Sequence, residues 1–471
     1  MKVGGLGMRR GSGRLLLLLL LFAGTQSLEG CAVVPRVRAW IEQPPGAAPN
    51  FHGSNGPLTA AQSRAVMVRL TARNHHATVL DRHVALETAL ADSPLYVGNK
   101  LTLLSNGRDA FSAMFAAIRA AKNNLDLEFY IFKNVESDGH RLLPLLLEKR
   151  REGVVVNIIY DSYGSGDASG TFLTSLRKAG VNFVDYNPFN PLLIWLFNDR
   201  DHRKILIADG KLAIIGGVNL DTVYTEPDTI VDPATGRKVP QFWNDADVEI
   251  QGPAVAALQR LFFAHWRDQN GRPVEPADYF PHLTAQGHEI VRIIGSSPRR
   301  TVPDYYVSLL SAMSNAEHNI WVTAAYFVPT KAELRDMMAA ARRGDDVRLY
   351  LPGHSDGSTM ALAVGRSHYT ALLKAGVKIY EAPFNVTLHS KFVTIDGVWS
   401  VIGSSNFDHR SVIFNDEVDA VVLGRPFAKR LQQLFMKDIA DDKRIRLRAW
   451  RKRPAIDDIG DNLARIWQSL L

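Results

Sequence analysis

The feature of this sequence that most constrains its fold is a motif that occurs twice with the same internal spacing. In both copies a lysine follows the histidine by two residues, an aspartate by seven, a glycine by fourteen and an asparagine by seventeen. The copies are His202, Lys204, Asp209, Gly216 and Asn219 in the first half, and His389, Lys391, Asp396, Gly403 and Asn406 in the second. Because chance recurrence of so many spacings is improbable, we predict a duplicated fold.

The segments around the two copies also repeat in the same order. We expect helices over 109–122 and 142–152, and again over 304–317 and 331–343; we expect strands over 125–132, 154–160, 319–328 and 345–351. Helices that alternate with continuous apolar strands are typical of a buried sheet covered by helices. A chain of 471 residues is also long enough for two cores. The predicted fold class is α/β with two tandem domains.

The motif itself indicates phosphate chemistry. A histidine and a lysine two residues apart on a strand project from the same face, so an imidazole and an ammonium group can converge on one anion. The asparagine that follows can donate its amide hydrogens to a phosphoryl oxygen. For one copy alone, a core histidine or a metal ligand is the alternative, but two matched copies make both interpretations improbable. Lysine is not a usual metal ligand and no HExxH motif occurs, so no metal or cofactor is expected.

Charge favours an anionic partner. The 55 Lys and Arg residues against 48 Asp and Glu give a net charge of +7, and a basic surface attracts phospholipid or nucleic acid. The stretch Lys443–Arg453 mixes cations with Ile, Leu and Trp, which is typical of segments that bind anionic membrane surfaces. The apolar stretch 188–197 is a candidate guide for acyl chains. A solvated helix end and a buried core segment, respectively, are the alternatives for these two stretches.

The N-terminus has the pattern of an export signal. Four basic residues precede the apolar run 15–23, which is shorter than the roughly 20 residues that a membrane-spanning helix needs. Cys31, the only cysteine, follows Leu28, Glu29 and Gly30 in a stretch that resembles the lipobox of bacterial lipoproteins. We therefore expect a protein of the bacterial cell envelope, exported, membrane-associated and lipid-anchored at Cys31. A cleaved signal or a retained signal anchor is the alternative.

The duplicated motif resembles that of the phospholipase D superfamily, in which H-x-K-x4-D occurs twice and the two halves form one shared site. The resemblance covers about residues 95–450 and implies two αβ(βα) sandwich domains related by pseudo-two-fold symmetry. It implies that His202 attacks phosphorus to form a phosphohistidine, and that His389 protonates the leaving alkoxide. The sequence alone does not determine which histidine attacks.

The same resemblance implies roles for the remaining motif residues. Lysines and asparagines neutralise developing charge, and the small residues after the returning strand bind substrate. Asp209 and Asp396 belong to the catalytic motif, although a structural role at a turn is an alternative for both. The residues implied to contact substrate are Lys204, Asn219 and Gly217 in the first copy, and Lys391, Asn406 and Ser404 in the second.

Carboxylates are expected behind the two imidazoles. The triplet Asn415-Asp416-Glu417 resembles the N-x-E element of the superfamily, in which the carboxylate orients a catalytic histidine. Glu417 is therefore predicted as one orienting group. Asp245 is its expected counterpart in the first half.

Several segments look like bacterial cardiolipin synthases: 129–132, 202–205, 216–219, 326–329 and 403–411. That resemblance implies a phosphatidyltransferase that acts on phosphatidylglycerol or another phospholipid. A hydrolase that releases phosphatidic acid is the first alternative, since water can replace the acceptor lipid. An exported nuclease is the second, although a nucleic-acid partner is disfavoured, and a catalytically inactive scaffold is the third. The chain lacks the paired N-terminal transmembrane segments of the commonest synthases.

These patterns together predict the organisation of the chain. We expect a signal and possible lipobox over 1–31, a tether with a leading helix over 32–94, the first catalytic domain over 95–285, the second over 286–440, and a basic amphipathic tail over 441–471. The leading helix is expected over 58–90. The sequence does not determine the oligomeric state.

Overall fold

The computed structural model describes residues 34–35, 37, 41, 51–74, 77–81, 93–188, 190, 198–232, 235–298, 302–355, 358–440 and 442–470. The chain divides into two compact units, residues 1–34 and 35–471, and all elements below belong to the second. The expected signal segment and Cys31 lie outside the described residues, as does most of the apolar stretch 188–197. Among the described residues, no helix combines the length and the apolar character needed to cross a bilayer.

The N-terminal elements of the described chain are a short hairpin and one helix, β1 (Phe51–Gly53), β2 (Gly56–Pro57) and α3 (Ala60–Arg73). A capping box between Thr59 and Gln62 starts the helix, since each side chain accepts a backbone N–H of the other residue. The side-chain amide of Asn74 donates to the Leu70 carbonyl at 2.6 Å and ends it. The helix expected over 58–90 is therefore interrupted after Arg73, because a local side-chain bond replaces the next helical turn. Residues 78–81 are again helical, and 82–92 lie outside the described residues.

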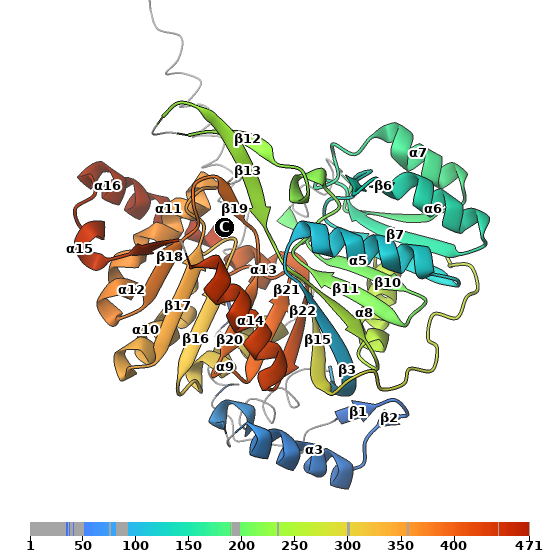
Figure 1. The fold of residues 1–471 in the computed structure, drawn as a ribbon, viewed down its shortest axis with the longest axis horizontal. Coiled ribbons are helices and arrows are strands. Elements are labelled where there is room, and N and C mark those ends of the chain that lie inside the picture. Colours follow the sequence, from blue (N-terminus) through green and yellow to red (C-terminus); the bar gives the residue numbers. More distant parts are fainter. Residues whose placement is uncertain are drawn as a thin grey trace, which may run out of the picture. The chain divides into compact units, whose positions relative to one another are not determined.

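The first half contains a seven-stranded sheet with the order β8-β7-β4-β10-β11-β14-β3 (Figure 1). Helices α5 to α7 pack on one face and α8 on the other, because successive residues of each strand point to opposite faces. The elements are β3 (Leu95–Leu104), α5 (Gly107–Ala120), β4 (Asn124–Phe129), α6 (Leu142–Arg151), β7 (Val155–Asp161), α7 (Gly170–Lys178), β8 (Asn182–Tyr186), β10 (Lys204–Ala208), β11 (Leu212–Gly216), β14 (Asp247–Gln251) and α8 (Val255–Asp268).

The second half repeats this sheet in the order β18-β17-β16-β20-β21-β22-β15, with β23 added beside β18. Each strand occupies the place of its counterpart in the first half. The elements are β15 (Glu289–Ser296), α9 (Asp304–Ser314), β16 (Asn319–Thr323), α10 (Lys331–Arg343), β17 (Asp346–Leu351), α11 (Thr359–Ser367), α12 (Tyr369–Ala375), β18 (Lys378–Glu381), β20 (Phe392–Ile395), β21 (Trp399–Gly403), β22 (Asn415–Leu423), α14 (Arg425–Asp438) and β23 (Lys443–Ile445). The predicted tandem α/β fold is confirmed.

The two halves share a continuous core. Strand β3 pairs with β14 of its own half and with β15 of the other. One hydrophobic cluster contains the inward faces of α8 and α14 together with residues of both sheets, among them Ile205, Val248, Ile402 and Val418. Side chains of both halves are therefore removed from water together, which stabilises one fixed arrangement of the two motifs.

The expected strands over 125–132 and 319–328 are shorter in the structure, ending at Phe129 and Thr323. Beyond these points the chain leaves the sheet and makes only an isolated bridge in each half, Phe132 with Leu220 and Phe327 with Phe407. The apolar run continues because these segments remain buried, so hydrophobicity alone does not mark the end of the strand.

Candidate active site

A short parallel strand pairing between the halves positions His202. Strand β9 (Arg200–Asp201) pairs with Asn415–Asp416 at the start of β22, and the His202 N–H donates to the Asp416 carbonyl at 2.9 Å. This register places the His202 ring beside the next carboxylate along β22. Nδ1 of His202 lies 2.9 and 3.1 Å from the two carboxylate oxygens of Glu417.

The reciprocal pairing positions His389. A hairpin of the first half pairs with the second half. It consists of β12 (Asp228–Val231) and β13 (Lys238–Asn244), and β13 pairs in parallel with β19 (Val386–Leu388). The His389 N–H donates to the Asn244 carbonyl at 2.7 Å, and Nδ1 lies 2.6 Å from the Asp245 carboxylate. Each histidine is thus oriented by a carboxylate of the opposite half.

This arrangement determines which ring nitrogen can react. When a carboxylate accepts the hydrogen of Nδ1, the lone pair of a neutral imidazole remains on Nε2. Burial, followed by the charges of Lys204 and Lys391, holds the pKa of His202 well below its usual value. His202 is therefore neutral near pH 7, as a nucleophile or a general base must be.

The two carboxylates are themselves buried. Burial raises the pKa of Glu417 to about 7 and that of Asp245 to about 7. Glu417 also accepts hydrogen bonds from Ser404, Ser411 and Asn415, at 2.5, 2.8 and 3.1 Å. These donors stabilise its charged form and fix its direction toward His202.

The two lysines lie within the site and are almost completely buried. Nζ of Lys204 donates to the His202 carbonyl at 2.6 Å, and Nζ of Lys391 donates to the His389 carbonyl and lies 3.0 Å from Nδ1 of that ring. Burial lowers the pKa of Lys204 to about 7. An anion placed between the two ammonium groups would favour their protonated forms.

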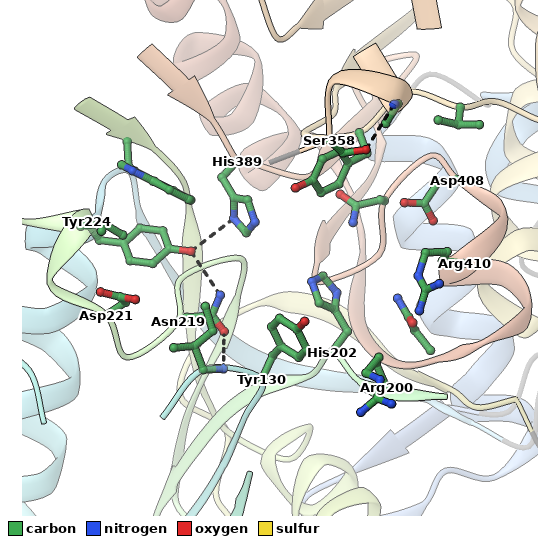
Figure 2. Close-up of a pocket in the computed structure, with 18 residues that line it drawn as sticks. Tyr130, Arg200, His202, Asn219, Asp221, Tyr224, Ser358, His389, Asp408 and Arg410 are labelled. Carbon is green, nitrogen blue, oxygen red and sulfur yellow. Dashed lines mark hydrogen bonds between the residues drawn. The ribbon is translucent and has the colours of Figure 1, made fainter. Parts of the chain in front are cut away.

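A pocket of about 360 Å³ joins the two copies (Figure 2). His202 and His389 line it from opposite sides, and Asn219 and Asn406 also reach its wall. The Asn219 amide is held in place, since Oδ1 accepts from the Ile131 N–H at 3.1 Å and Nδ2 donates to a tyrosine hydroxyl. The pocket brings together the imidazoles and amides that the motif spacing singled out.

The small residues of the two copies lie elsewhere than expected. A Cβ atom on Gly217 would fall 2.1 Å from a carboxylate oxygen of Asp245, and the Ser404 hydroxyl donates to Glu417. Neither Gly217 nor Ser404 lines the pocket. Gly217 leaves room for the orienting carboxylate of Asp245 and Ser404 supports that of Glu417, while their contact with substrate stays a prediction.

The aspartates of the motif lie at the far ends of the strands. Asp209 and Asp396 both adopt φ of 53°, in the left-handed region, at the turn that follows β10 or β20. The carboxylate of Asp209 accepts the backbone N–H groups of residues 122–124 at 2.7–3.1 Å. That of Asp396 accepts those of 317–319 at 2.8–2.9 Å. The structure supports the turn role for both residues and corrects their inclusion among the catalytic ones.

Aromatic and cationic residues that sequence reasoning missed complete the pocket. Tyr130 makes an edge contact with the His202 ring at 5.5 Å, and Arg200 and Arg410 line the wall on that side (Figure 2). The Tyr224 hydroxyl lies 3.4 Å from Nδ1 of His389, whose ring also lies 5.4 Å from that of Trp243. Tyr130 and Arg410 fall inside segments that resemble synthases, whereas no sequence signal marks Tyr224.

A buried ionic network lies behind His202. Arg203 points away from the pocket and pairs with Glu128 at 3.3 Å and Asp416 at 3.2 Å, while His265 lies 2.8 Å from Glu128. Glu128, Asp201 and His265 are close enough together to surround a metal ion. The guanidinium group already supplies positive charge there, so we interpret the cluster as an ion-pair network.

Two similar α/β halves, with two carboxylate-oriented histidines around one pocket and a buried lysine beside each histidine, define a phosphodiester-transferring enzyme of the phospholipase D type. Comparison with known proteins agrees. The family described as "Cardiolipin synthase, PLD-like domain" matches residues 114–229 and 309–439. The chain is 32% identical to a cardiolipin synthase of Geobacillus kaustophilus over 385 residues, which is 81% of this chain and 74% of that protein.

Further relatives and one solved structure support the same assignment. Cardiolipin synthase 2 of Bacillus anthracis is 32% identical over 374 residues, 78% of this chain and 70% of the relative. The fold resembles that of phosphatidylserine synthase from Haemophilus influenzae, with a TM-score of 0.57 and 12% identity over 82% of this chain and 96% of that one. The chain belongs to the cardiolipin synthase family of phospholipase D-like proteins, and it is a phosphatidyltransferase that acts on phospholipid.

Proposed function

We propose that this phosphatidyltransferase makes cardiolipin by moving the phosphatidyl group of phosphatidylglycerol to the hydroxyl of a second lipid. The observation that carries the proposal is the pair of imidazoles on opposite sides of one pocket, each held at Nδ1 by a carboxylate. A nucleophile and a general acid must lie on opposite sides of phosphorus for in-line displacement.

In the first step, Nε2 of His202 forms a bond to phosphorus and the bond from phosphorus to the headgroup oxygen breaks. His389, protonated at both ring nitrogens, gives the Nε2 proton to the departing alkoxide, which leaves as an alcohol. In the second step, His389 takes the proton of the incoming hydroxyl, whose oxygen attacks phosphorus and releases His202. Lys204 and Lys391 neutralise the charge that develops on the phosphoryl oxygens.

The order of the histidines follows from their surroundings. The pKa of His202 is held well below its usual value by burial and by nearby lysines and Arg410, which favours a neutral nucleophile. His389 lines the opposite side of the pocket, with Nδ1 held by the Asp245 carboxylate. This position supports the role of general acid in the first step and general base in the second.

The pocket wall favours a lipid substrate. Aromatic and aliphatic side chains line it: Val223, Tyr224, Trp243, Tyr326, Val328 and Ala361. The rings of Tyr224 and Trp243 lie 6.1 and 5.4 Å from that of His389. Such walls exclude water and contact hydrocarbon. Transfer to water would instead release phosphatidic acid, and this hydrolysis is the second outcome that the experiment distinguishes.

The test is incubation of the purified protein with phosphatidylglycerol, with and without phosphatidylethanolamine, and mass spectrometry of the products. Cardiolipin supports the proposal, whereas phosphatidic acid alone makes the protein a hydrolase. The variants His202→Ala and His389→Ala should form neither product, and His140→Ala, a change at an exposed histidine, is the matched control. No lipid product from the wild-type protein would contradict the proposal.

We also propose catalytic domains over 95–285 and 286–440, and a location in the bacterial cell envelope with a lipid anchor at Cys31. The repeated sheets support the division, and the lipobox-like stretch supports the anchor. The variant Cys31→Ser, expressed beside the wild type, should lose the mass of the lipid and become extractable from membranes by high salt. Unchanged mass would contradict the anchor.

A further inference from the structure

The C-terminal segment presents an apolar stripe to solvent. It forms α15 (Leu447–Trp450), α16 (Ala455–Ala464) and η3 (Arg465–Leu470). Four large aliphatic side chains on α16 and η3 are far more exposed than core residues: Ile456 at 72%, Ile459 at 55%, Leu463 at 59% and Ile466 at 71%. Their spacing of three, four and three residues places them on one side of the helix. We call these four residues the α16 stripe.

The apolar residues of the basic stretch Lys443–Arg453 do not form this surface. Ile445 is buried, in register with Ile379 of β18. Trp450 packs on Tyr369 with ring centroids 4.9 Å apart, and Arg453 covers its ring at 3.9 Å. This stretch therefore contributes its apolar side chains to the core and leaves its cations outside, while the helix after it exposes the apolar side chains.

The cations beside the α16 stripe give it a charge preference. Between residues 443 and 466 the chain has eight Lys and Arg residues and three Asp residues. Two of those aspartates, Asp458 and Asp461, already pair with Arg453. The exposed cations are Lys443, Arg444, Arg446, Arg448, Arg451, Lys452 and Arg465. An apolar stripe flanked by such cations matches the interface of an anionic bilayer.

The α16 stripe is also close to the catalytic pocket. Helix α16 packs against α11, as Figure 1 shows, and Ser358 and Ala361 at the start of α11 line that pocket. The Gln468 side chain donates to the Pro329 carbonyl at 2.9 Å, next to Val328 in the pocket wall. A bilayer that holds α16 would therefore lie a short distance from the reacting phosphate.

A hollow between the two helices extends the apolar surface. It has a volume of about 830 Å³ and is lined by Met360 of α11 and by Ile456 and Leu463 of the α16 stripe. Its charged lining is mixed: Lys443, Arg366 and Arg453 stand beside the carboxylates of Glu381, Asp457 and Asp461. The aliphatic side chains of the hollow therefore extend the apolar surface of the stripe, and the hollow itself is not selective for anions.

We propose that the α16 stripe docks this protein on the surface of an anionic phospholipid bilayer, so that lipid reaches the catalytic pocket along α11. The inference rests on the proposed function for its substrate. It commits to a bilayer and not to a second copy, because two copies meeting at this face would bring two clusters of excess cations together.

A local probe tests the docking. Since Cys31 is the only cysteine, Cys31→Ser with Ile459→Cys gives one labelling site for an environment-sensitive fluorophore. The matched control is Cys31→Ser with Val68→Cys, at an apolar residue of α3 that is 66% exposed. With phosphatidylglycerol vesicles, the emission of the label at 459 should shift to shorter wavelength, and that at 68 should not. Equal shifts at both sites, or none at 459, would overturn the proposal.

Activity gives an independent measurement. The double variant Ile459→Glu with Ile466→Glu should lose about tenfold or more of the wild-type activity on phosphatidylglycerol vesicles. Its activity on dispersed short-chain phosphatidylglycerol should stay within about twofold, because the stripe is outside the pocket. Equal activity on vesicles would overturn the docking. A wild-type protein without activity on the dispersed lipid would contradict the proposed function. The fluorescence measurement would then still test the docking by itself.

Two further controls separate the bilayer from other occupants. Vesicles of phosphatidylcholine should shift the emission at 459 much less than anionic vesicles do, and equal shifts would overturn the charge preference. Light scattering in solution should give the same mass for the wild type and the double variant. A wild-type dimer that the two substitutions dissociate would assign the stripe to a second copy and overturn the proposal.

Discussion

The two copies of the motif differ in what supports them, although each contributes a histidine and an asparagine to the pocket. In the first copy the residue after His202 is Arg203, which pairs with the buried carboxylates of Glu128 and Asp416. In the second copy it is Ser390, whose hydroxyl donates to the Asn244 side chain at 2.9 Å. The residue after His202 thus belongs to a buried ion-pair network, whereas the residue after His389 makes one neutral hydrogen bond.

The pocket walls differ in the same way. Arg410 in the wall beside His202 stands 21 residues after His389, as Val223 stands 21 residues after His202. Asn415 stands two residues before Glu417, as Trp243 stands two residues before Asp245. The first side is therefore cationic and polar, and the second is aliphatic and aromatic. The comparison teaches that duplication preserved the motif residues while their surroundings diverged, and this divergence supports the proposal that the two histidines have different tasks.

The largest expected effect tests that division of tasks. Both His202→Asn and His389→Asn should lower kcat by about 10⁴-fold or more. With a lipid analogue whose leaving group needs no acid, His389→Asn should still give a burst of product and a phosphohistidine, detected by mass spectrometry of the enzyme. His202→Asn should give neither. A burst from His202→Asn alone would reverse the assignment.

The next largest effect concerns Glu417 and Asp245, the carboxylates that each orient the histidine of the opposite half. Glu417→Gln and Asp245→Asn should each lower kcat by about 10³-fold, because the ring that each carboxylate orients loses its preferred tautomer. Unfolding by denaturant should show that both variants remain folded. Asp209→Asn serves as the matched carboxylate change outside the pocket. Equal activity of Glu417→Gln and the wild type would contradict the orienting role.

Arg203 and Ser390, the residues that follow the two histidines, should differ in how much they contribute to the free energy of unfolding. Arg203→Met leaves Glu128 and Asp416 buried without their cation and should cost about 3–5 kcal/mol in the free energy of unfolding. Ser390→Ala removes one neutral hydrogen bond and should cost about 1 kcal/mol. Denaturant titration measures both. Equal losses would remove the distinction between an ionic and a neutral support.

The pH dependence of kcat/KM should have a maximum near neutral pH. Burial raises the pKa of Glu417 to about 7, so the carboxylate is lost as pH falls below that value. Burial lowers the pKa of Lys204 to about 7, so its positive charge is lost as pH rises above it. Activity on dispersed substrate should fall by about tenfold per pH unit on either side.

The variant Lys204→Arg distinguishes the acid side of the pH profile of kcat/KM from its alkaline side, because a guanidinium group stays protonated at high pH. The alkaline limb of this variant should move to higher pH while the acid limb stays. A profile that is flat from about pH 5 to about pH 9 would contradict both assignments.

The smallest expected effect concerns Asp209 and Asp396, the aspartates at the turns after β10 and β20. Asp209→Asn and Asp396→Asn should cost about 1 kcal/mol of stability, since an amide oxygen accepts the same backbone N–H groups more weakly than a carboxylate does. Their kcat/KM should stay within about twofold of the wild type. A loss as large as that of the histidine variants would return these aspartates to the catalytic group.

Much of the fold could be predicted because its signals are local. The helix expected over 331–343 coincides with α10, where Thr330 and Glu333 form a capping box and Gly344 ends the helix at φ of 107°. The turns after β10 and β20 also follow from local chemistry, since aspartate followed by glycine tolerates two successive left-handed residues. The predicted end of β4 is wrong because the chain stays buried beyond the last residue that pairs within the sheet.

The sequence by itself determined the duplication, the α/β class and the histidines and asparagines that line the pocket, because spacing and periodicity are properties of short segments. Only the tertiary structure decided that Glu417 orients His202 and Asp245 orients His389. Those pairs are 215 and 144 residues apart, and short parallel pairings between the halves bring them together. The tertiary structure also decided which face of α16 is exposed, since an amphipathic pattern shows that a helix has an apolar face and not what covers it.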